Sequence, residues 1–261
     1  MGVCRVNGLR LYFHSAGQGE PLLLLHGLGS SSRDWENQIP EFAKHYRVIA
    51  PDFRGFGGSA RAGDYSVEHF AADVWGLLAR LGISRFHLLG YSMGGAVALQ
   101  MALDRPERVR KLVLSNCLPS FRPDTWGKRL LLWSRLLLMS LFGPRRLSQS
   151  VAQKLFPHPD QAALRAKVAR RNARNDKGVY LQTIRALVRW SVRERLGELK
   201  HPVLLLAAQH DYFSRPDLDD FVTALPDARL TVFPGTRHGL PLEAPRDYNR
   251  AVLEFLREQH P

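Results

Sequence analysis

The sequence predicts an α/β fold in which a mostly parallel central sheet carries helices on both faces. Segments with strand character alternate with segments of helical periodicity along most of the chain, and this alternation is typical of parallel sheets. We expect strands near residues 9–14, 22–26, 46–50, 86–89, 111–115, 203–207 and 229–233. Between the strands that end near residue 115 and begin near residue 203, the chain has helical character and predicts a helical lid.

An early strand leads into a glycine-containing loop. The run Leu22-Leu23-Leu24-Leu25 continues into His26-Gly27-Leu28-Gly29. The glycines allow the chain to turn so that the Leu28 amide can stabilise the oxyanion that forms when a nucleophile attacks a carbonyl. His26 is a candidate base by residue type, but its position in the loop favours a structural role.

Residues 86–99 predict a strand, a sharp turn and a helix around one serine. The apolar run Phe86–Leu89 is followed by Gly90-Tyr91-Ser92-Met93-Gly94 and then by Gly95 and a helical pattern. Glycines are needed here because a nucleophile held in a strained backbone conformation leaves no room for flanking side chains. The pattern predicts a nucleophile elbow with Ser92 as nucleophile and the Met93 amide as the other oxyanion donor.

Two further strands end in residues that can activate this serine. Residues 203–208 predict a buried strand followed by Gln209-His210-Asp211, and residues 229–233 predict a strand followed by a turn and His238. A helix is expected to begin near Pro245. In this architecture the acid and the base follow the nucleophile in the order Ser, Asp, His. Asp211 is therefore the expected acid and His238 the expected base.

With these residues assembled, the chain resembles the α/β-hydrolase superfamily, and within it lid-bearing serine hydrolases of the esterase or lactonase type. The resemblance covers nearly the whole chain and rests on five ordered segments, namely residues 26–29, 51–59, 90–95, 210–211 and 235–245. It implies Ser92, Asp211 and His238 as the catalytic triad, the Leu28 and Met93 amides as the oxyanion hole, and no cofactor or metal. Asp52 and Arg54 fall in a stretch that such proteins use mainly to shape a loop.

The resemblance implies a divided core. We expect a first core part at residues 1–117, a helical lid insertion at 118–200 and a second core part at 201–261. Many related proteins have a glycine shortly before the acid and another directly before the base, whereas this chain has Gln209 and Arg237. Asp217 is therefore kept as the alternative acid, and the Arg237 side chain is expected to face solvent.

The implied reaction is acyl transfer to water, with cleavage of an ester, thioester or lactone through an acyl-enzyme. Epoxide hydrolases and haloalkane dehalogenases resemble this fold but carry Asp at the nucleophile position, so Ser92 excludes both. Hydrolases of carbon–carbon bonds often have Trp shortly after the base, whereas Gly239 and Leu240 follow His238 here. Carbon–carbon hydrolysis, perhydrolysis and a receptor-like binding role with slow turnover remain alternatives.

Composition fits a compact catalytic domain. The chain has 261 residues, 45% of them hydrophobic, and can bury a substantial core without disulfides or metals. Its two cysteines, Cys4 and Cys117, have no metal-ligand spacing and are expected to be reduced thiols. No apolar stretch of secretory length opens the sequence, so a cytoplasmic location is expected.

The expected lid carries a net charge equal to the net charge of the whole chain, so the remaining residues are neutral in sum. Residues 119–200 contain 18 Lys and Arg against 5 Asp and Glu, and the net charge of the protein is +13. A solvated helix face is the simplest interpretation. The alternatives are docking of an acidic partner such as an acyl carrier protein, steering of an anionic small-molecule acyl substrate, or contact with an anionic membrane. Nucleic acid is disfavoured because the segment lacks a binding module and a stacking platform of aromatic residues.

The most apolar segment of the sequence lies within the same insertion. Residues 130–142 are almost entirely apolar apart from Arg135 and two serines, and they are too few to span a bilayer. They are expected to pack as a lid helix, to form one wall of an acyl pocket, or to touch lipid. An apolar acyl part in the substrate is the corresponding expectation.

Overall fold

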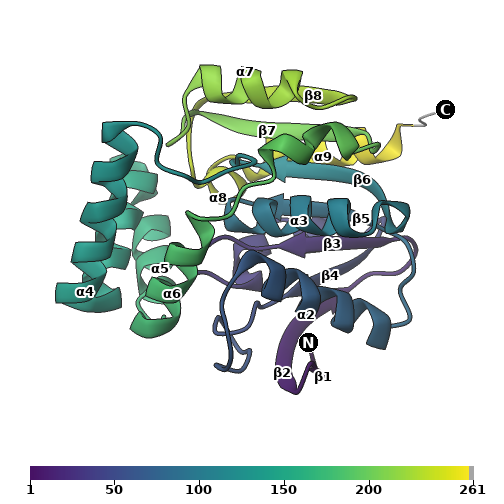
Figure 1. Cartoon of the computed structure of the whole chain (residues 1–261), viewed down its shortest axis with the longest axis horizontal. Helices are drawn as coiled ribbons and strands as arrows, with labels where there is room; N and C mark the ends of the chain where they lie inside the picture. Colours follow the sequence, from purple (N-terminus) through teal and green to yellow (C-terminus); the bar gives the residue numbers. More distant parts are fainter. Residues whose placement is uncertain (259–261) are drawn as a thin grey trace.

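The computed structural model describes residues 1–258 and contains one eight-stranded sheet (Figure 1). Its order is β1-β2-β4-β3-β5-β6-β7-β8; β1 and β2 pair antiparallel, β2 joins β4 antiparallel, and all remaining neighbours are parallel. The strands are β1 Gly2–Val6, β2 Leu9–Ala16, β3 Pro21–Leu25, β4 Arg47–Pro51, β5 Phe86–Tyr91, β6 Val109–Ser115, β7 Val203–His210 and β8 Ala228–Arg237. The predicted mostly parallel sheet is confirmed. The sequence did not predict β1, an edge strand that buries little apolar surface.

Helices cover both faces of the sheet, as the sequence predicts. Those of the core are α1 Ile39–Phe42, α2 Val67–Arg80, α3 Met93–Asp104, α7 Arg215–Thr223, α8 Leu240–Glu243 and α9 Pro245–Arg257. Side chains of α2, α3 and α7 pack in one hydrophobic core, and those of α1 and α9 pack in the other. Strand β3 shows why the sheet needs both layers. Leu23 and Leu25 enter the first core and Leu22 and Leu24 the second, because successive side chains point to opposite faces.

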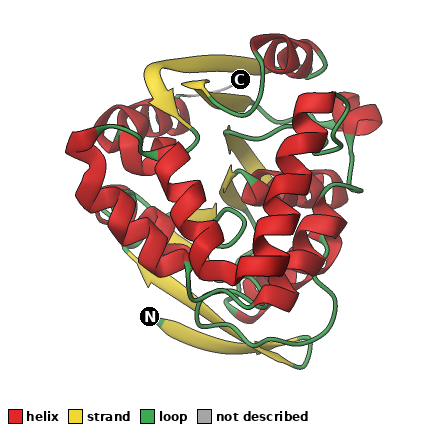
Figure 2. Ribbon diagram, turned by 90° about the vertical axis from the view of Figure 1, so that its left-hand side faces the viewer, coloured by secondary structure: helices red, strands yellow, loops and turns green. Residues whose placement is uncertain are grey.

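Three helices form an insertion between β6 and β7. They are α4 Trp126–Leu155, α5 Ala162–Asn172 and α6 Lys177–Leu187, and they lie together at one end of the sheet (Figure 1). Figure 2 looks directly onto them. Helix α4 is kinked where Gly143 adopts a φ of 70° and Pro144 follows, because proline lacks an amide hydrogen and its ring clashes with the preceding turn. No helix within residues 1–258 is both long and apolar enough to cross a membrane.

The loop after β4 is held by two buried acidic side chains. Asp52 accepts hydrogen bonds from the Ser32 amide at 2.7 Å and the Gly58 amide at 2.8 Å. Asp73 on α2 forms a bidentate pair with Arg54, whose Nε and one Nη donate at 2.6 Å each. Both side chains of this pair are at least 93% buried. Asp52 and Arg54 therefore shape the loop, as the sequence predicts for them.

Three buried histidines make the stability of the fold sensitive to acid. Burial lowers the pKa of His26, His87 and His201. Each neutral histidine contributes fully to the stability of the fold above the pKa of about 6.5 that it has in the unfolded chain. This contribution is lost as the pH falls from there through the lower pKa of the folded state, because the unfolded chain then binds more protons than the folded one.

We expect the free energy of unfolding, measured with urea, to fall from about pH 7 to about pH 5, by at most about 1.4 kcal/mol per pH unit for each histidine. His201→Gln should make this slope shallower. A wild-type free energy that does not change over this range would contradict the assignment.

Candidate active site

Ser92 sits at the junction of β5 and α3 in a conformation that non-glycine residues rarely adopt. Its φ is 54° and its ψ is −118°. The Ser92 amide donates to the Ser115 carbonyl of β6 at 2.9 Å, and the Gly95 amide donates to the Ser92 carbonyl at 2.9 Å. These bonds hold the strained residue in place, and the turn presents its hydroxyl at the carboxyl edge of the sheet.

The glycines around Ser92 are required by close backbone contacts. A Cβ atom at Gly90 would lie 2.3 Å from the Gly94 carbonyl oxygen, and one at Gly94 would lie 2.1 Å from the Leu25 carbonyl oxygen. At Gly95 it would lie 2.4 Å from Cys117 Sγ. Strand β5, strand β3 and helix α3 therefore approach one another more closely than any side chain would permit.

The strain at Ser92 predicts a gain in stability when a glycine replaces it. Ser92→Gly removes the Cβ that disfavours positive φ, whereas Ser92→Ala keeps it, and both remove the hydroxyl. We expect the glycine variant to exceed the alanine variant in unfolding free energy by about 1 kcal/mol in urea titrations. Equal stabilities would show that the backbone of Ser92 is not strained.

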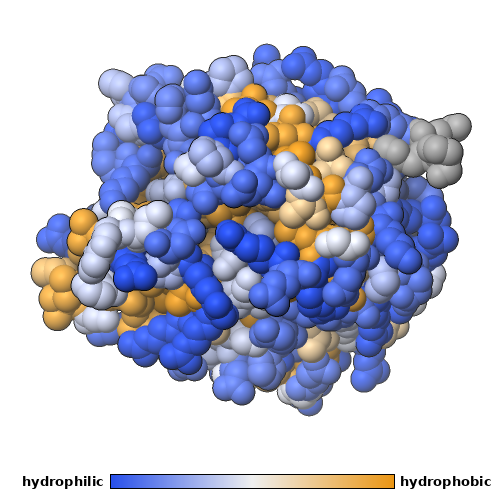
Figure 3. Space-filling model, turned by 45° about the horizontal axis from the view of Figure 1, so that its top comes forward, coloured by the Kyte–Doolittle hydropathy of each residue, from blue (hydrophilic) through white to orange (hydrophobic). Residues whose placement is uncertain are grey.

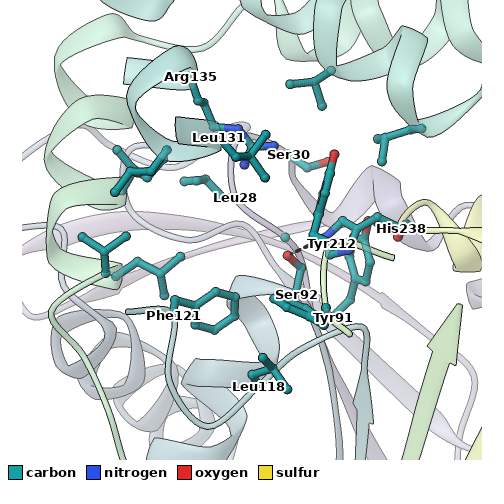
Figure 4. Close-up of a pocket in the computed structure, with 18 of the residues that line it drawn as sticks. Leu28, Ser30, Tyr91, Ser92, Leu118, Phe121, Leu131, Arg135, Tyr212 and His238 are labelled. Carbon is teal, nitrogen blue, oxygen red and sulfur yellow. Dashed lines mark hydrogen bonds between the residues drawn. The ribbon is translucent and has the colours of Figure 1, made fainter. Parts of the chain in front are cut away.

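Two side chains from distant strands meet Ser92. His238 Nε2 lies 2.9 Å from Ser92 Oγ (Figure 4), and His238 Nδ1 lies 2.6 Å from Asp211 Oδ1. Asp211 is 2% exposed and also accepts a hydrogen bond from the Tyr212 amide. The structure thus brings together the three side chains that the sequence singles out. With Nδ1–H donating to Asp211, Nε2 is free to take the proton of the serine hydroxyl.

Asp217, the alternative acid, is occupied elsewhere. It caps α7 through hydrogen bonds with Ser214, and its Oδ1 lies 3.1 Å from Lys128 Nζ. Burial opposes ionisation of Asp217, but the Ser214 hydrogen bonds and the Lys128 charge lower its pKa overall. Only Asp211 of these two carboxylates bonds to His238.

The two predicted oxyanion donors flank Ser92. Leu28 follows β3 and lines the same pocket as Ser92, and Met93 is the first residue of α3. The amide of a first helical residue has no carbonyl partner one turn earlier. Among the described residues, neither the Leu28 nor the Met93 amide donates to a turn, cap or side-chain acceptor. Both amides therefore remain available to a developing negative charge.

His26 and Asp34 hold the loop that carries Leu28. His26 is fully buried; its Nδ1 donates to the Gly27 carbonyl at 2.8 Å, and its Nε2 accepts from the Phe53 amide at 3.0 Å. With both nitrogens engaged, His26 has the structural role favoured by its sequence position. Asp34, which sequence reasoning missed, accepts from the Gly27 amide and the Ser30 hydroxyl, and burial raises its pKa.

Asn116 and Tyr91 support the histidine and were also missed. Asn116 Nδ2 donates to the His238 carbonyl at 3.0 Å, while Asn116 Oδ1 accepts from the Ala208 amide on β7. Tyr91 donates its hydroxyl hydrogen to the same His238 carbonyl at 2.8 Å. A positive φ of 47° at Asn116 is unusual for a non-glycine residue. The backbone of His238 is thus held by the last residue of β5 and by the residue that follows β6.

A pocket of about 200 Å³ opens above Ser92. The core contributes Leu28, Tyr91 and Tyr212, and the segment between β6 and β7 contributes Leu118, Phe121, Leu131, Leu132, Val151, Leu155, Tyr180, Ile184 and Leu187 (Figure 4). Residues 130–142 therefore do form part of a pocket wall. Their other side is exposed to solvent, so packing alone does not describe this segment.

Arg237 differs from its expected position. Its side chain is half-buried rather than solvent-facing, and its Nε is buried without a hydrogen-bond partner among the described residues. It does not line the pocket. Within residues 1–258, no group of three or more His, Cys, Asp or Glu side chains is arranged to hold a metal ion.

Comparison with known proteins identifies the family. The family model described as the alpha/beta hydrolase fold matches residues 20–245. This chain belongs to the α/β-hydrolase family. The family assignment agrees with the observed sheet and elbow and makes the protein a hydrolase of this type.

Relatives of similar length support the same assignment. RutD of Pseudomonas savastanoi pv. phaseolicola, which is named as a carbamate hydrolase, is 34% identical; the match covers 92% of this chain and 95% of RutD. The 2-hydroxy-6-oxo-6-phenylhexa-2,4-dienoate hydrolase of Burkholderia cepacia is 32% identical, with 96% and 92% covered.

Solved structures share the whole fold. An esterase of Thermogutta terrifontis superposes with a TM-score of 0.85 at 27% identity, with 98% of each chain covered. The enol-lactonase of Burkholderia xenovorans superposes with a TM-score of 0.89 at 24% identity, with 98% of this chain and all of the other covered.

Proposed function

We propose that this protein is a serine hydrolase that cleaves a carboxylic ester with an apolar acyl part, through an acyl-enzyme on Ser92. The observation that carries the proposal is the chain of contacts from Ser92 Oγ to His238 Nε2 at 2.9 Å and from His238 Nδ1 to Asp211 Oδ1 at 2.6 Å. It is the arrangement that serine nucleophiles require for activation.

The steps follow from this geometry. His238 Nε2 accepts the Ser92 proton as Oγ attacks the ester carbonyl, and the resulting oxyanion receives hydrogen bonds from the Leu28 and Met93 amides. Protonated His238 then gives the proton to the departing alkoxide, which leaves as an alcohol. Water, deprotonated by His238, attacks the acyl-enzyme and releases the carboxylic acid. Asp211 keeps the imidazole oriented and stabilises its charged form.

The apolar lining of the pocket supports an apolar acyl part. Leu118, Phe121, Leu131 and Leu155 supply side chains that gain free energy when an alkyl chain displaces water. Since the pocket measures about 200 Å³, short and medium acyl chains fit it better than long ones.

Hydrolysis of p-nitrophenyl esters from two to twelve carbons tests this proposal. We expect kcat/KM to rise from two to about six carbons, by roughly threefold for each added methylene that is buried, and to fall for the longest chains. Mass spectrometry of rapidly quenched reactions should detect the protein carrying the acyl group. Absence of turnover on all esters, together with absence of an acylated species, would contradict the proposal.

Carbon–carbon bond hydrolysis is the second candidate. It is favoured by the 32% identity to a hydrolase of that type. Against it, Gly239 follows His238, and a Cβ at Gly239 would lie 2.6 Å from the Phe156 ring, so an indole side chain has no room there. Turnover of a vinylogous diketone at a higher kcat/KM than every ester would establish this candidate instead.

A further inference from the structure

A cation of the insertion enters the pocket above Ser92. Arg135 lies on the side of α4 that also carries Leu131 and Leu132, and all three line the pocket. Figure 4 shows the Arg135 side chain leaving α4 toward the middle of the cavity. Its guanidinium carbon lies 5.5 Å from the centre of the Tyr212 ring. The charge is therefore placed beside the apolar side chains of the pocket, whose lining also includes Asp34, Asp124, Arg122, Lys128 and Arg193.

No carboxylate among the described residues forms an ion pair with Arg135. Lys128, about two turns away on the same helix, lies 2.9 Å from Asp124 and 3.1 Å from Asp217. The pocket also contains Asp34, but that carboxylate already accepts from Gly27 and Ser30. Unlike Lys128, Arg135 therefore has no anionic partner among the described residues.

The neighbours of Arg135 are phenols. Burial opposes its charge, but Tyr180 and Tyr212 more than offset this and raise the pKa of Arg135, so the side chain is charged at neutral pH. The Tyr212 hydroxyl is buried and is one of the groups that stabilise the charged form of Arg135. A buried charge whose neighbours are phenols and not carboxylates is costly unless a ligand balances it.

We propose that Arg135 binds a carboxylate of the substrate, so that the apolar acyl chain of the hydrolysed ester ends in a free carboxylate, remote from the reacting carbonyl. A guanidinium presents parallel N–H donors that match the two oxygens of a carboxylate. Tyr212 supplies a further donor beside it. This inference rests on the proposed function of Ser92 and adds the substrate class to it.

Ester binding to the inactive Ser92→Ala variant tests the role of Arg135 separately from the proposed function, because it requires no turnover. Monobenzyl glutarate and benzyl valerate have acyl chains of equal length. The chain of the first ends in a carboxylate, and that of the second ends in a methyl group. With Ser92→Ala protein, we expect the charged ester to bind about 10- to 100-fold more tightly in titration calorimetry. Adding Arg135→Met should remove this preference, and Arg135→Lys should retain part of it.

Matched controls distinguish a direct contact from the general basic charge. Arg129 lies on the same helix, is exposed and stacks on Trp126 at 5.4 Å, so Arg129→Gln removes the same charge outside the pocket and should keep the preference. Free glutarate should compete with the charged ester, and inorganic phosphate should compete more weakly. Equal affinities for the two esters, equal losses of both in Arg135→Met, or stronger competition by phosphate would overturn the carboxylate assignment.

A separate observation concerns the exposed apolar side chains of α4. Six large apolar side chains are exposed there by 59–78%. Trp126, Leu130, Trp133, Leu137 and Leu141 recur at helical spacing, and Phe142 follows them. We call these six residues the apolar stripe. Figure 3 shows an apolar patch at the edge of the molecule formed by the insertion. Of the large hydrophobic residues exposed within residues 1–258, only Met1 and Val3 lie outside the stripe.

The charge of α4 indicates what covers the apolar stripe. The helix contains six Lys or Arg residues and no Asp or Glu, and the surrounding insertion holds a charge equal to the net +13 of the chain. A second copy would bring two such charges together, which disfavours self-association. Exposed Trp, Leu and Phe beside Lys and Arg suit the interface of an anionic bilayer. We infer that the insertion docks on an anionic lipid surface through the apolar stripe.

Vesicle co-sedimentation tests the docking. We expect the full-length protein to bind vesicles containing phosphatidylglycerol, to bind pure phosphatidylcholine vesicles weakly, and to lose binding as salt is raised. The double substitution Trp133→Ser with Leu137→Ser should lower binding at least tenfold, whereas Val3→Ser on β1, which is 60% exposed, should not. Failure to bind anionic vesicles, unchanged binding of the double variant, or a dimer that the double variant dissociates would overturn the inference.

Discussion

Replacing Ser92 with Ala is expected to lower kcat for ester hydrolysis by at least about 10⁴-fold, with a much smaller change in KM. The substitution removes the atom that attacks the carbonyl, while the pocket that binds the acyl chain remains. His238→Ala should cause a loss of the same order, since Ser92 Oγ lies 2.9 Å from His238 Nε2 and has no other base within the described hydrogen bonds. The measurement is steady-state kinetics on p-nitrophenyl butyrate.

Combining these substitutions tests whether the residues act as one unit. The double variant Ser92→Ala with His238→Ala should be no slower than either single variant, because each alone already abolishes nucleophilic attack. Asp211→Asn is expected to lower kcat by about 10⁴-fold through the wrong orientation or tautomer of the imidazole. Asp217→Asn is the matched control and should retain nearly full kcat, because Asp217 bonds to Ser214 and Lys128. Multiplicative losses in the double variant would contradict a common mechanism.

Removing Arg54 is expected to produce the largest loss of stability. Arg54→Met leaves the Asp73 carboxylate, which is 2% exposed, without its bidentate partner, and breaking a buried pair in this way costs about 3–5 kcal/mol. That is a large part of the about 5–15 kcal/mol by which domains are stable. Urea unfolding should therefore show a much lower midpoint, while the folded fraction keeps its kcat.

Two comparisons control for this effect. The double variant Arg54→Met with Asp73→Leu leaves no buried charge and should recover most of the lost stability. Arg215→Met breaks an exposed pair, with side chains 64% and 51% exposed, and should change the unfolding free energy by less than about 1 kcal/mol. A loss in Arg215→Met as large as that in Arg54→Met would show that burial of the Arg54 pair is not the cause.

Much of the site could be predicted because its signals are local in sequence. Ser92 is marked by the glycines that its strained turn requires, and Asp211 and His238 each follow a strand whose apolar run ends just before them. Parallel strands place their carboxyl ends at one edge, so three local patterns determine one site. The same reasoning located the Leu28 loop.

The supporting residues could not be predicted because their partners are distant in sequence. Asn116 bonds to a carbonyl 122 residues away, and Tyr91 to the same carbonyl 147 residues away. Nothing near Tyr91 in the sequence signals this contact. For Asn116 the one local hint is that it is a polar residue directly after the buried strand β6.

The two faces of α4 could not be predicted from the sequence either. The sequence shows that residues 130–142 are apolar almost all round, but only the packing of α4 against α5 and α6 decides which side chains enter the pocket. Arg135 interrupts the apolar run in the sequence, but no neighbouring residue in the sequence indicates where its side chain points. In the structure it is directed into the cavity.

Labelling with a fluorophosphonate, followed by mass spectrometry of the digested protein, tests the role of Ser92 most directly. The reagent phosphonylates serines that a neighbouring base activates. We expect one adduct, located on Ser92, that is lost in Ser92→Ala and strongly reduced in His238→Ala. An unlabelled wild-type protein, or an adduct on a different serine that persists in Ser92→Ala, would contradict Ser92 as the nucleophile.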